Sequence, residues 1–362
     1  MEKINWTRRL RTMSVLGKVS REYLRKVIYG SLGSKRNEVL LGPQFGVDNA
    51  VVRIRKGQVL VATTDPLSFI PELGARDSAW LSVNLLASDL ATSGFLPQYG
   101  VFDFNLPPTM KNSDFASYWR SFHHECSKLG LAIVGGHTGR YEGCGYTIIG
   151  GGVLFAIGSE GKYLASTMAE DGDDIILTKG AAVETTAILT RVFPRTVKKV
   201  LGPKLFERAR SYLRSVSTVK EALIAVSVGI HREGVTAMHD ATEGGVMAAV
   251  LELATASRLG VELDLDSIPV SQETDEVCRL FRIDPLTSLS EGSLIIACNP
   301  ERTSRLLNRL RLERIESEVI GRLTKRTRLA YAKDRRGRRK LRYPKSDPYW
   351  RAYWSAIRKG WD

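Results

Sequence analysis

Three aspartates stand beside apolar stretches in the first hundred residues of the chain. Asp48 precedes a strand-like apolar run at 50–54, Asp65 ends a second run at 59–64, and Asp89 lies in an apolar segment with helical character. Removing a carboxylate from water is costly unless it is paired or binds a cation. If the three converge, they suggest a site for Mg²⁺ and a nucleotide, because Mg²⁺ prefers a few carboxylates together with substrate phosphates. The alternative is that each aspartate caps a turn or a helix.

Glycine-rich stretches later in the chain could admit a phosphate chain close to the backbone. Residues 135–138 read Gly-Gly-His-Thr, where a strand-like run enters a turn without bulky side chains. Gly244 and Gly245 come between a strand-like run and a long helix expected at 246–259. The N-terminus of such a helix offers unpaired N–H groups and the positive end of its dipole to an anion. Three further glycines, at 150–152, interrupt an expected strand, which indicates close approach by a ligand or a facing sheet.

Composition sets the class of protein. A chain of 362 residues is long enough for two domains, and 43% hydrophobic with 25% charged residues is typical of a globular protein. No stretch approaches the roughly 18 apolar residues that cross a bilayer, and the N-terminus has no secretion signal, so we expect a cytoplasmic protein without membrane contact. The four cysteines are far apart and lack a CxxC spacing, which argues against a zinc site and against disulfides. P-loop, GxGxxG, HExxH and GxSxG motifs are absent from the sequence.

Positive charge is concentrated at the C-terminal end. The net charge is +14, and residues 321–362 contain fifteen Lys and Arg against three Asp. Residues 327–333 and 338–343 alternate around a turn, which predicts a hairpin, and Ser346 is expected to cap a helix with an aromatic face. Two hypotheses follow: the tail packs on the body with its arginines in solvent, or it attracts nucleic acid, another polyanion or a partner protein.

Two strand-like runs at 50–54 and 59–64, joined by a turn at 55–58, predict a hairpin, and apolar residues three or four apart from about Ser113 to Leu129 predict an amphipathic helix. The sequence turns polar near 158–172, so we expect residues 1–160 to form an N-terminal domain and residues 161–325 a C-terminal domain. Residues 326–362 are expected to add the basic hairpin and helix to the C-terminal domain.

Six motifs in order resemble the aminoimidazole ribonucleotide synthetase (PurM-like) superfamily over roughly residues 20–330, and the HypE-like, AIR synthase-related branch of archaea is the most similar. They are GVDNAVV (46–52), TTDP (63–66), SDLA (88–91), GGHT (135–138), LTKG (177–180) and HDATEGG (239–245). The resemblance implies a two-domain α/β protein, with an N-terminal domain whose sheet joins that of a second subunit in a dimer barrel, and a C-terminal α/β sandwich domain. It also implies binding of ATP with Mg²⁺ and transfer of the γ-phosphoryl group to a small substrate, in several members so that an oxygen can leave.

The resemblance also implies roles for individual residues. Asp48, Asp65 and Asp89 would hold Mg²⁺, and the catalytic candidates are Asp48, Asp65 and His137. The residues expected to bind the nucleotide are Gly46, Asp89, Gly135, Gly136, Thr138, Asp240, Thr242, Gly244 and Gly245.

The sequence also departs from the family pattern. Many relatives have Asp at the position of His137, and an imidazole is not a hard oxygen ligand. HypE proper uses a C-terminal cysteine, whereas this chain ends Arg358-Lys359-Gly360-Trp361-Asp362, so S-cyanide chemistry is not expected. The main hypothesis is therefore an ATP- and Mg²⁺-dependent homodimeric phosphotransferase or ligase-type enzyme whose small-molecule substrate the sequence leaves open. The alternatives are a non-catalytic nucleotide-binding maturation or scaffold protein that uses its basic tail, and thiamine-monophosphate kinase.

Overall fold

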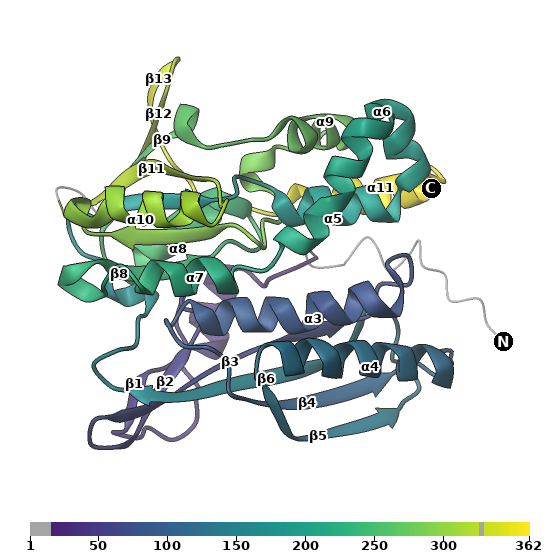
Figure 1. The fold of residues 1–362 in the computed structure, drawn as a ribbon, viewed down its shortest axis with the longest axis horizontal. Coiled ribbons are helices and arrows are strands. Elements are labelled where there is room, and N and C mark those ends of the chain that lie inside the picture. Colours follow the sequence, from purple (N-terminus) through teal and green to yellow (C-terminus); the bar gives the residue numbers. More distant parts are fainter. Residues whose placement is uncertain (1–15, 326–328) are drawn as a thin grey trace.

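The computed structural model describes residues 16–325 and 329–362, so residues 1–15 of the expected first domain and 326–328 of the expected tail lie outside the described residues. Two mixed α/β layers are stacked (Figure 1). The first sheet has the strand order β1-β2-β3-β6-β4-β5. Its strands are β1 (Val39–Leu41), β2 (Ala50–Arg55), β3 (Gln58–Ser68), β4 (Tyr99–Leu106), β5 (Ala132–Arg140) and β6 (Ile148–Ser159).

Two long helices cover one face of this sheet, α3 (Gly74–Ala91) and α4 (Asn112–Lys128). The expected amphipathic helix is confirmed as α4, which buries Tyr118, Phe122 and Cys126. Helix α3 is buried along most of its length because it lies between the sheet and the C-terminal half of the chain (Figure 1). The glycines at 150–152 sit in β6, and a Cβ at Gly152 would lie 2.7 Å from the Phe102 ring of β4. Part of the expected close approach is therefore made by the neighbouring strand.

The second sheet has the order β13-β12-β9-β11-β7-β10-β8. Alternate residues of β7 face opposite sides, Ile176 towards α7 and α10 and Ile175 towards α8, so the central strand is buried on both faces. Its strands are β7 (Asp174–Thr178), β8 (Val235–Asp240), β9 (Gly260–Asp264), β10 (Leu294–Cys298), β11 (Ser317–Thr324), β12 (Ala330–Asp334) and β13 (Gly337–Lys340). The helices of this half are α5 (Val183–Val192), α6 (Pro194–Ser211), α7 (Val219–Val226), α8 (Gly245–Ala256), α9 (Gln272–Phe281), α10 (Pro300–Leu312) and α11 (Pro348–Arg358).

One hydrophobic cluster joins the two halves. Leu86 and Leu90 of α3 belong to the same buried cluster as Ala222 of α7 and Met238 of β8. Buried apolar area is the main stabilising term in folding, so this shared core holds the N-terminal sheet and its helices against the second sheet.

The described part of the basic tail, residues 329–362, is folded. Strand β12 pairs in parallel with β9, β13 forms the edge of the sheet, and the β12–β13 ribbon extends beyond the body (Figure 1). Helix α11 packs on α9 through Tyr349 and Ala352. The expected helix cap is corrected from Ser346 to its neighbour: Asp347 caps α11 and accepts a hydrogen bond from Tyr349 N at 2.8 Å.

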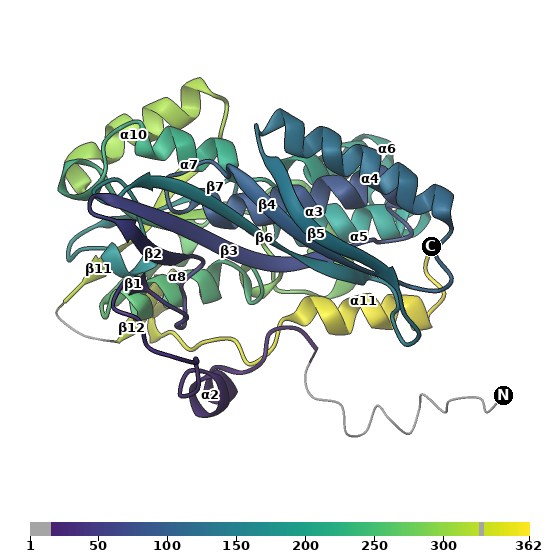
Figure 2. The same ribbon diagram turned by 90° about the horizontal axis from the view of Figure 1, so that it is seen from below.

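The second face of the N-terminal sheet is open to solvent (Figure 2). Large apolar side chains are exposed on its strands, among them Tyr99, Val101, Val134, Ile148 and Val153. The predicted dimer barrel would cover such a face, and it stays a prediction. Within the described residues, no helix combines the length and apolar character needed to cross a membrane.

Candidate functional site

A pocket of about 740 Å³ opens where the two halves meet. Four separate parts of the chain form its walls: residues 18–29, the loop 44–48 before β2, the end of β8 with the start of α8, and residues 343–347 beyond β13. The pocket therefore contains side chains from both domains and from both ends of the described chain.

The loop that carries Asp48 is tied to the elements that carry the other aspartates. Asn49 Nδ2 donates to the carbonyl of Asp89 at 2.9 Å and to Thr92 Oγ1 at 2.8 Å, which fixes the loop to the end of α3. Thr63 of β3 donates to the carbonyl of Asp48 at 2.9 Å. Asp65 lies two residues further along β3, on the same face.

Electrostatics places Asp240, at the end of β8, among these carboxylates. Burial raises the pKa of Asp89 well above its ordinary value, and the charges of Asp48, Asp65 and Asp240 raise it further. Burial likewise raises the pKa of Asp65 to about 6 and that of Asp240 to about 7. The charges of Asp48, Asp65 and Asp240 thus act together on Asp89, and the roles predicted for these four residues stay predictions.

Several of the acidic groups face no hydrogen-bond donor. Asp240 is fully buried, and neither of its carboxylate oxygens has a partner among the described residues. Glu291 and Glu184 are also buried, and each has one carboxylate oxygen without a hydrogen-bond partner among the described residues. Asp240 and Glu291 can hydrogen-bond to each other when one of them holds a proton, and this contact lowers the pKa of Asp240 against the effect of burial. An unpaired buried carboxylate is expensive, so the arrangement favours a bound cation.

His239 is one positive group at this site. Its Nδ1 lies 2.8 Å from Asp48 Oδ1, and its Nε2 lies 2.8 Å from Glu252 Oε2. Burial alone would lower the pKa of His239, but the two carboxylates outweigh this effect and raise it to about 10. The ring is therefore an imidazolium at neutral pH, and it joins the N-terminal loop to α8.

Lys18 is the second positive group. The residue as a whole is exposed, but its ammonium donates to Thr242 Oγ1 at 2.5 Å, and its backbone N–H donates to Glu243 Oε2 at 2.6 Å. Gly17 has a φ of +99°, a backbone conformation that favours glycine, and a Cβ there would lie 2.3 Å from Glu243 Oε2. Burial lowers the pKa of Lys18, but the surrounding carboxylates outweigh it and raise the pKa above its ordinary value. These carboxylates are those of Glu252, Asp89, Glu291 and Asp48.

The chemistry of the donors fits a hard divalent cation, because the unpaired atoms of Asp240, Glu291 and Glu184 are carboxylate oxygens and that of Asn49, beside Asp48, is an amide oxygen. As the side chains lie, however, no three of the His, Cys, Asp or Glu residues within 16–325 and 329–362 form a group that could hold a metal ion. The Lys18 ammonium is held among the same carboxylates. Metal ligation by Asp48, Asp65 and Asp89 stays a prediction.

The helix N-terminus predicted to bind an anion carries a side chain of the protein. The N–H of Gly244 donates to Asp347 Oδ2 at 2.8 Å, so a carboxylate stands where we expected a phosphate. Close packing accounts for the glycine at position 46, because a Cβ there would lie 2.5 Å from the carbonyl of Glu252. Thr242 accepts the hydrogen bond from Lys18, and Gly245 begins α8, where a Cβ would lie 2.6 Å from the carbonyl of Ser288.

The predicted residues on β5 lie elsewhere. Gly135, Gly136, His137 and Thr138 are exposed on the edge strand of the N-terminal sheet, and none of them lines the pocket. His137 Nε2 is 2.7 Å from the hydroxyl of Tyr141. Strands β6 and β4 separate β5 from β3, so β5 is about 14 Å from the strand that carries Asp65. A single chain does not bring these residues to the acidic pocket.

Sequence reasoning missed several residues that line the pocket or belong to the buried acidic cluster around Asp240. Glu252 had a readable signal, because it follows Gly245 by seven residues, two helical turns, on the same face of α8. For the others no local pattern marks a role. They are Lys18, Glu184, Glu291, Tyr343 and Asp347.

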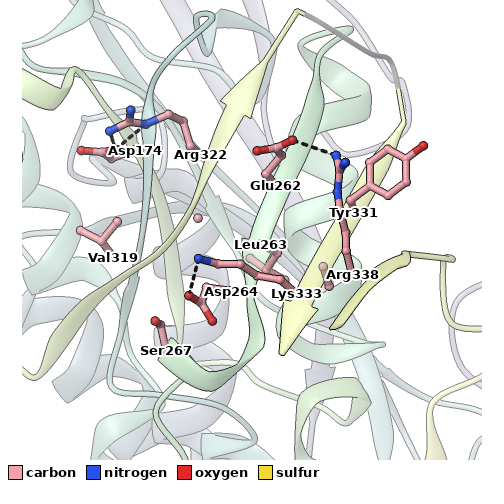
Figure 3. Close-up of a pocket in the computed structure, with 12 residues that line it drawn as sticks. Asp174, Glu262, Leu263, Asp264, Ser267, Val319, Arg322, Tyr331, Lys333 and Arg338 are labelled. Carbon is pink, nitrogen blue, oxygen red and sulfur yellow. Dashed lines mark hydrogen bonds and ion pairs between the residues drawn. The ribbon is translucent and has the colours of Figure 1, made fainter. Parts of the chain in front are cut away.

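A second hollow, of about 540 Å³, lies on the outer part of the C-terminal sheet (Figure 3). It is also lined by carboxylates, but each has a cation beside it. Asp174 accepts from Arg322 at 2.7 Å, Glu262 from Arg338 at 2.9 Å, and Lys333 lies 3.0 Å from Asp264 (Figure 3). The charges of this hollow compensate one another.

Comparison with known proteins decides the family. The family of AIR synthase related proteins matches in two parts, its N-terminal domain over residues 46–156 and its C-terminal domain over residues 170–333. The chain belongs to the AIR synthase-related family. Its PurM-like fold, most similar to the HypE-like members, agrees with the resemblance found in the motifs. Residues 334–362, which include the wall formed by 343–347, lie outside both matches.

Two relatives are similar over most of their length. A putative hydrogenase expression/formation protein of Methanocaldococcus jannaschii is 27% identical over 344 residues, which cover 92% of this chain and 96% of the relative. The carbamoyl dehydratase HypE of Azotobacter vinelandii is 28% identical over 281 residues, 76% of this chain and 77% of the relative.

Two solved structures share the fold of this AIR synthase-related chain. The hydrogenase maturation protein HypE in complex with ATP has a TM-score of 0.60 at 19% identity and covers 92% of this chain and 97% of its own. AaThiL complexed with AMPPCP and TMP has a TM-score of 0.62 at 18% identity, with coverage of 80% and 88%.

Proposed function

We propose that the chain binds ATP with Mg²⁺ in the acidic pocket and transfers the γ-phosphoryl group to a small substrate, or dehydrates that substrate at the expense of ATP. The observation that carries the proposal is the buried carboxylate of Asp240, whose two oxygens face no donor among the described residues. Phosphoryl transfer is catalysed mainly by positioning and by neutralising charge, so a rigid cluster of carboxylates around a cation suits this reaction. The HypE structure with ATP supports the choice of nucleotide.

Different residues have different roles in the proposed reaction. Asp48, Asp65 and Asp89 would hold Mg²⁺, which neutralises phosphate charge when bound. His239 orients Asp48, and Lys18 places an ammonium group at the N-terminal end of α8, beside Thr242. The pair Asp240 and Glu291 can keep a proton between them. Burial raises the pKa of the Cys126, Cys278 and Cys298 thiols to about 12, and the proposed reaction uses none of them.

The glycine strand enters the proposal through a homodimer. The open face of the N-terminal sheet exposes Tyr99, Val101 and Val153, and apolar surface of this kind favours a partner (Figure 2). A second copy packed on this face would take β5, with Gly135, Gly136, His137 and Thr138, into the subunit interface. In the proposed dimer these residues would line the phosphates of a nucleotide bound near that interface.

Asp65→Asn tests the nucleotide site. Titration calorimetry with Mg²⁺ and a nonhydrolysable ATP analogue should show binding to the wild type and a loss of at least about 100-fold in the variant, since a ligand of the cation loses its charge. Asp264→Asn is the matched control, because this carboxylate lies in the outer hollow against Lys333. Unchanged affinity in Asp65→Asn, with circular dichroism like that of the wild type, would contradict the proposal.

The ribbon β12–β13 favours a second candidate, a nucleotide-binding scaffold that recruits a polyanion. Arg336 and Lys340 are exposed on it and Arg342 follows it, and none of the three has an ion-pair partner among the described residues. This function predicts no ADP release with any metabolite mixture and binding to an RNA homopolymer that weakens steeply with salt. A polyanion interaction that is absent or insensitive to salt would contradict it.

A further inference from the structure

A chain of hydrogen bonds leads from the C-terminal segment to Asp48. The hydroxyl of Tyr343 donates to Glu252 Oε1 at 2.6 Å, and Glu252 Oε2 accepts from His239 Nε2 at 2.8 Å. His239 Nδ1 donates in turn to Asp48 Oδ1 at 2.8 Å. Four side chains thus connect a residue outside both family matches with a predicted ligand of the cation.

The middle of this series of hydrogen bonds is almost closed to water. His239 and Glu252 are 3% and 5% exposed, so a lost partner could not be replaced easily from solvent. Each ring nitrogen of His239 has one carboxylate partner, which leaves the imidazole a single orientation. Any change that frees Glu252 therefore frees the ring and, with it, the Asp48 carboxylate.

The polypeptide chain is held by hydrogen bonds both before and after Tyr343. Before it, the buried Leu341 donates its N–H to the carbonyl of Ala330 at 2.9 Å. After it, Asp347 accepts from Gly244 N and caps α11. The Tyr343 ring also meets Phe45 edge to face, with centroids 5.4 Å apart. The hydroxyl is therefore presented to Glu252 by a fixed backbone.

We propose that Tyr343 and Glu252 are positioning residues, which act through His239 to hold the Asp48 carboxylate in the orientation that receives the cation and its nucleotide. The inference rests on the proposed function. It gives the C-terminal segment a role in the site: residues 343–347 influence how tightly the pocket binds the cation and its nucleotide. Residues that orient a metal ligand in this way typically change metal affinity by about 10- to 100-fold when they are mutated.

Tyr343→Phe removes the hydroxyl and keeps the ring on Phe45. We expect the affinity for Mn²⁺ with a nonhydrolysable ATP analogue to fall about tenfold, or about 1.4 kcal/mol. Affinity for the same analogue in EDTA should stay unchanged, because the nucleotide alone does not depend on the orientation of Asp48. Tyr331→Phe is the control: this phenol lies on β12 beneath Arg338, whose guanidinium is 4.1 Å from the ring centroid.

A double-mutant cycle separates positioning from simple stability. Glu252→Gln should also weaken Mn²⁺–nucleotide binding, and adding Tyr343→Phe to it should cost little more, since both changes break the same chain. The inference is overturned if Tyr343→Phe binds Mn²⁺–nucleotide like the wild type, if it loses metal-free nucleotide by the same factor, or if the two effects add. A wild type that binds no Mn²⁺–nucleotide would overturn the proposed function itself. Wild-type binding with an unchanged variant overturns only this inference.

Discussion

Two hollows of this protein are lined by carboxylates, and they differ in how those charges are compensated. On the outer part of the C-terminal sheet, Asp174, Glu262 and Asp264 each have an arginine or lysine beside them (Figure 3). Between the domains, Asp240 has no partner for either oxygen among the described residues, and Lys18 and His239 serve many more acidic groups than they can pair. The first hollow is complete as it stands, whereas the second is short of positive charge.

The difference teaches which acidic cluster belongs to function. Paired charges at a surface contribute little to stability and need no further explanation. Unpaired carboxylates that are buried from water destabilise the folded state, and a protein that keeps them does so for a ligand that binds them. The two hollows should therefore respond with opposite signs when a carboxylate is neutralised.

Asp240→Asn gives the largest expected effect. The amide keeps the shape of the side chain but removes a carboxylate whose charged form is disfavoured by burial, so we expect the free energy of unfolding to rise by about 1–3 kcal/mol. Binding of Mg²⁺ with a nonhydrolysable ATP analogue should weaken by about 100-fold or more. Urea denaturation and calorimetry measure the two quantities.

Asp174→Asn is the matched change in the outer hollow. Asp174 accepts hydrogen bonds from Arg322 at 2.7 Å and from Thr303 at 2.8 Å, so its neutralisation should destabilise the protein by about 1–2 kcal/mol. Nucleotide affinity should not change. If Asp240→Asn were the destabilising variant and Asp174→Asn the stabilising one, the contrast between the hollows would be wrong.

Lys18→Met tests the same contrast between the hollows by removing a positive charge from the inner pocket. Removing an ammonium group from among Glu252, Asp89 and Asp48 makes the pocket more negative, so affinity for Mn²⁺ alone should rise, by about tenfold for a change of about 1.4 kcal/mol. Stability should fall, because fewer carboxylates are compensated. Lys26→Met is the control, since Lys26 forms an exposed pair with Glu22 at 2.6 Å. Weaker Mn²⁺ binding would mean that Lys18 does not oppose the cation.

The pH dependence of stability gives a smaller effect of the same origin. Burial, followed by the charge of Asp347, raises the pKa of Glu184 to about 8, above its ordinary value of 4.5. The folded protein therefore holds this proton more tightly than the unfolded chain, and the resulting stability is full below pH 4.5 and lost as the pH rises through 8. Glu184→Gln should flatten the decline in unfolding free energy between pH 5 and pH 8. A variant whose slope equals that of the wild type would contradict this origin.

Local patterns predicted the parts of the molecule that are specified locally. The helical spacing of Phe122 and Cys126 predicted α4, and the turn at Gly57 predicted the β2–β3 hairpin. The motifs predicted that Asp48, Asp65 and Asp89 converge, because each lies at the end or edge of an element that folds against the others.

The rest of the site depends on how distant segments pack. Lys18 meets Glu243 across 225 positions of the chain, and Tyr343 meets Glu252 across 91, so no spacing along the sequence reveals either contact. The family resemblance predicts that Gly135 and Gly136 line the phosphates of a nucleotide held by the aspartates. The order of strands places β6 and β4 between these glycines and Asp65, and strand order is not written in any single motif.

Lys333→Ala gives the smallest expected effect and closes the comparison. The pair with Asp264 is 3.0 Å long, but 68% of the Lys333 side chain is exposed, so water and salt screen it. We expect a loss of unfolding free energy of at most about 1 kcal/mol, which should shrink further in 1 M salt, and no change in nucleotide affinity. Parallel urea titrations at low and high salt test this. Removing an ion-pair partner that water already solvates should not lower the unfolding free energy by more than about 2 kcal/mol. A larger loss would mean that the outer hollow depends on its ion pairs as strongly as the inner pocket depends on its ligand.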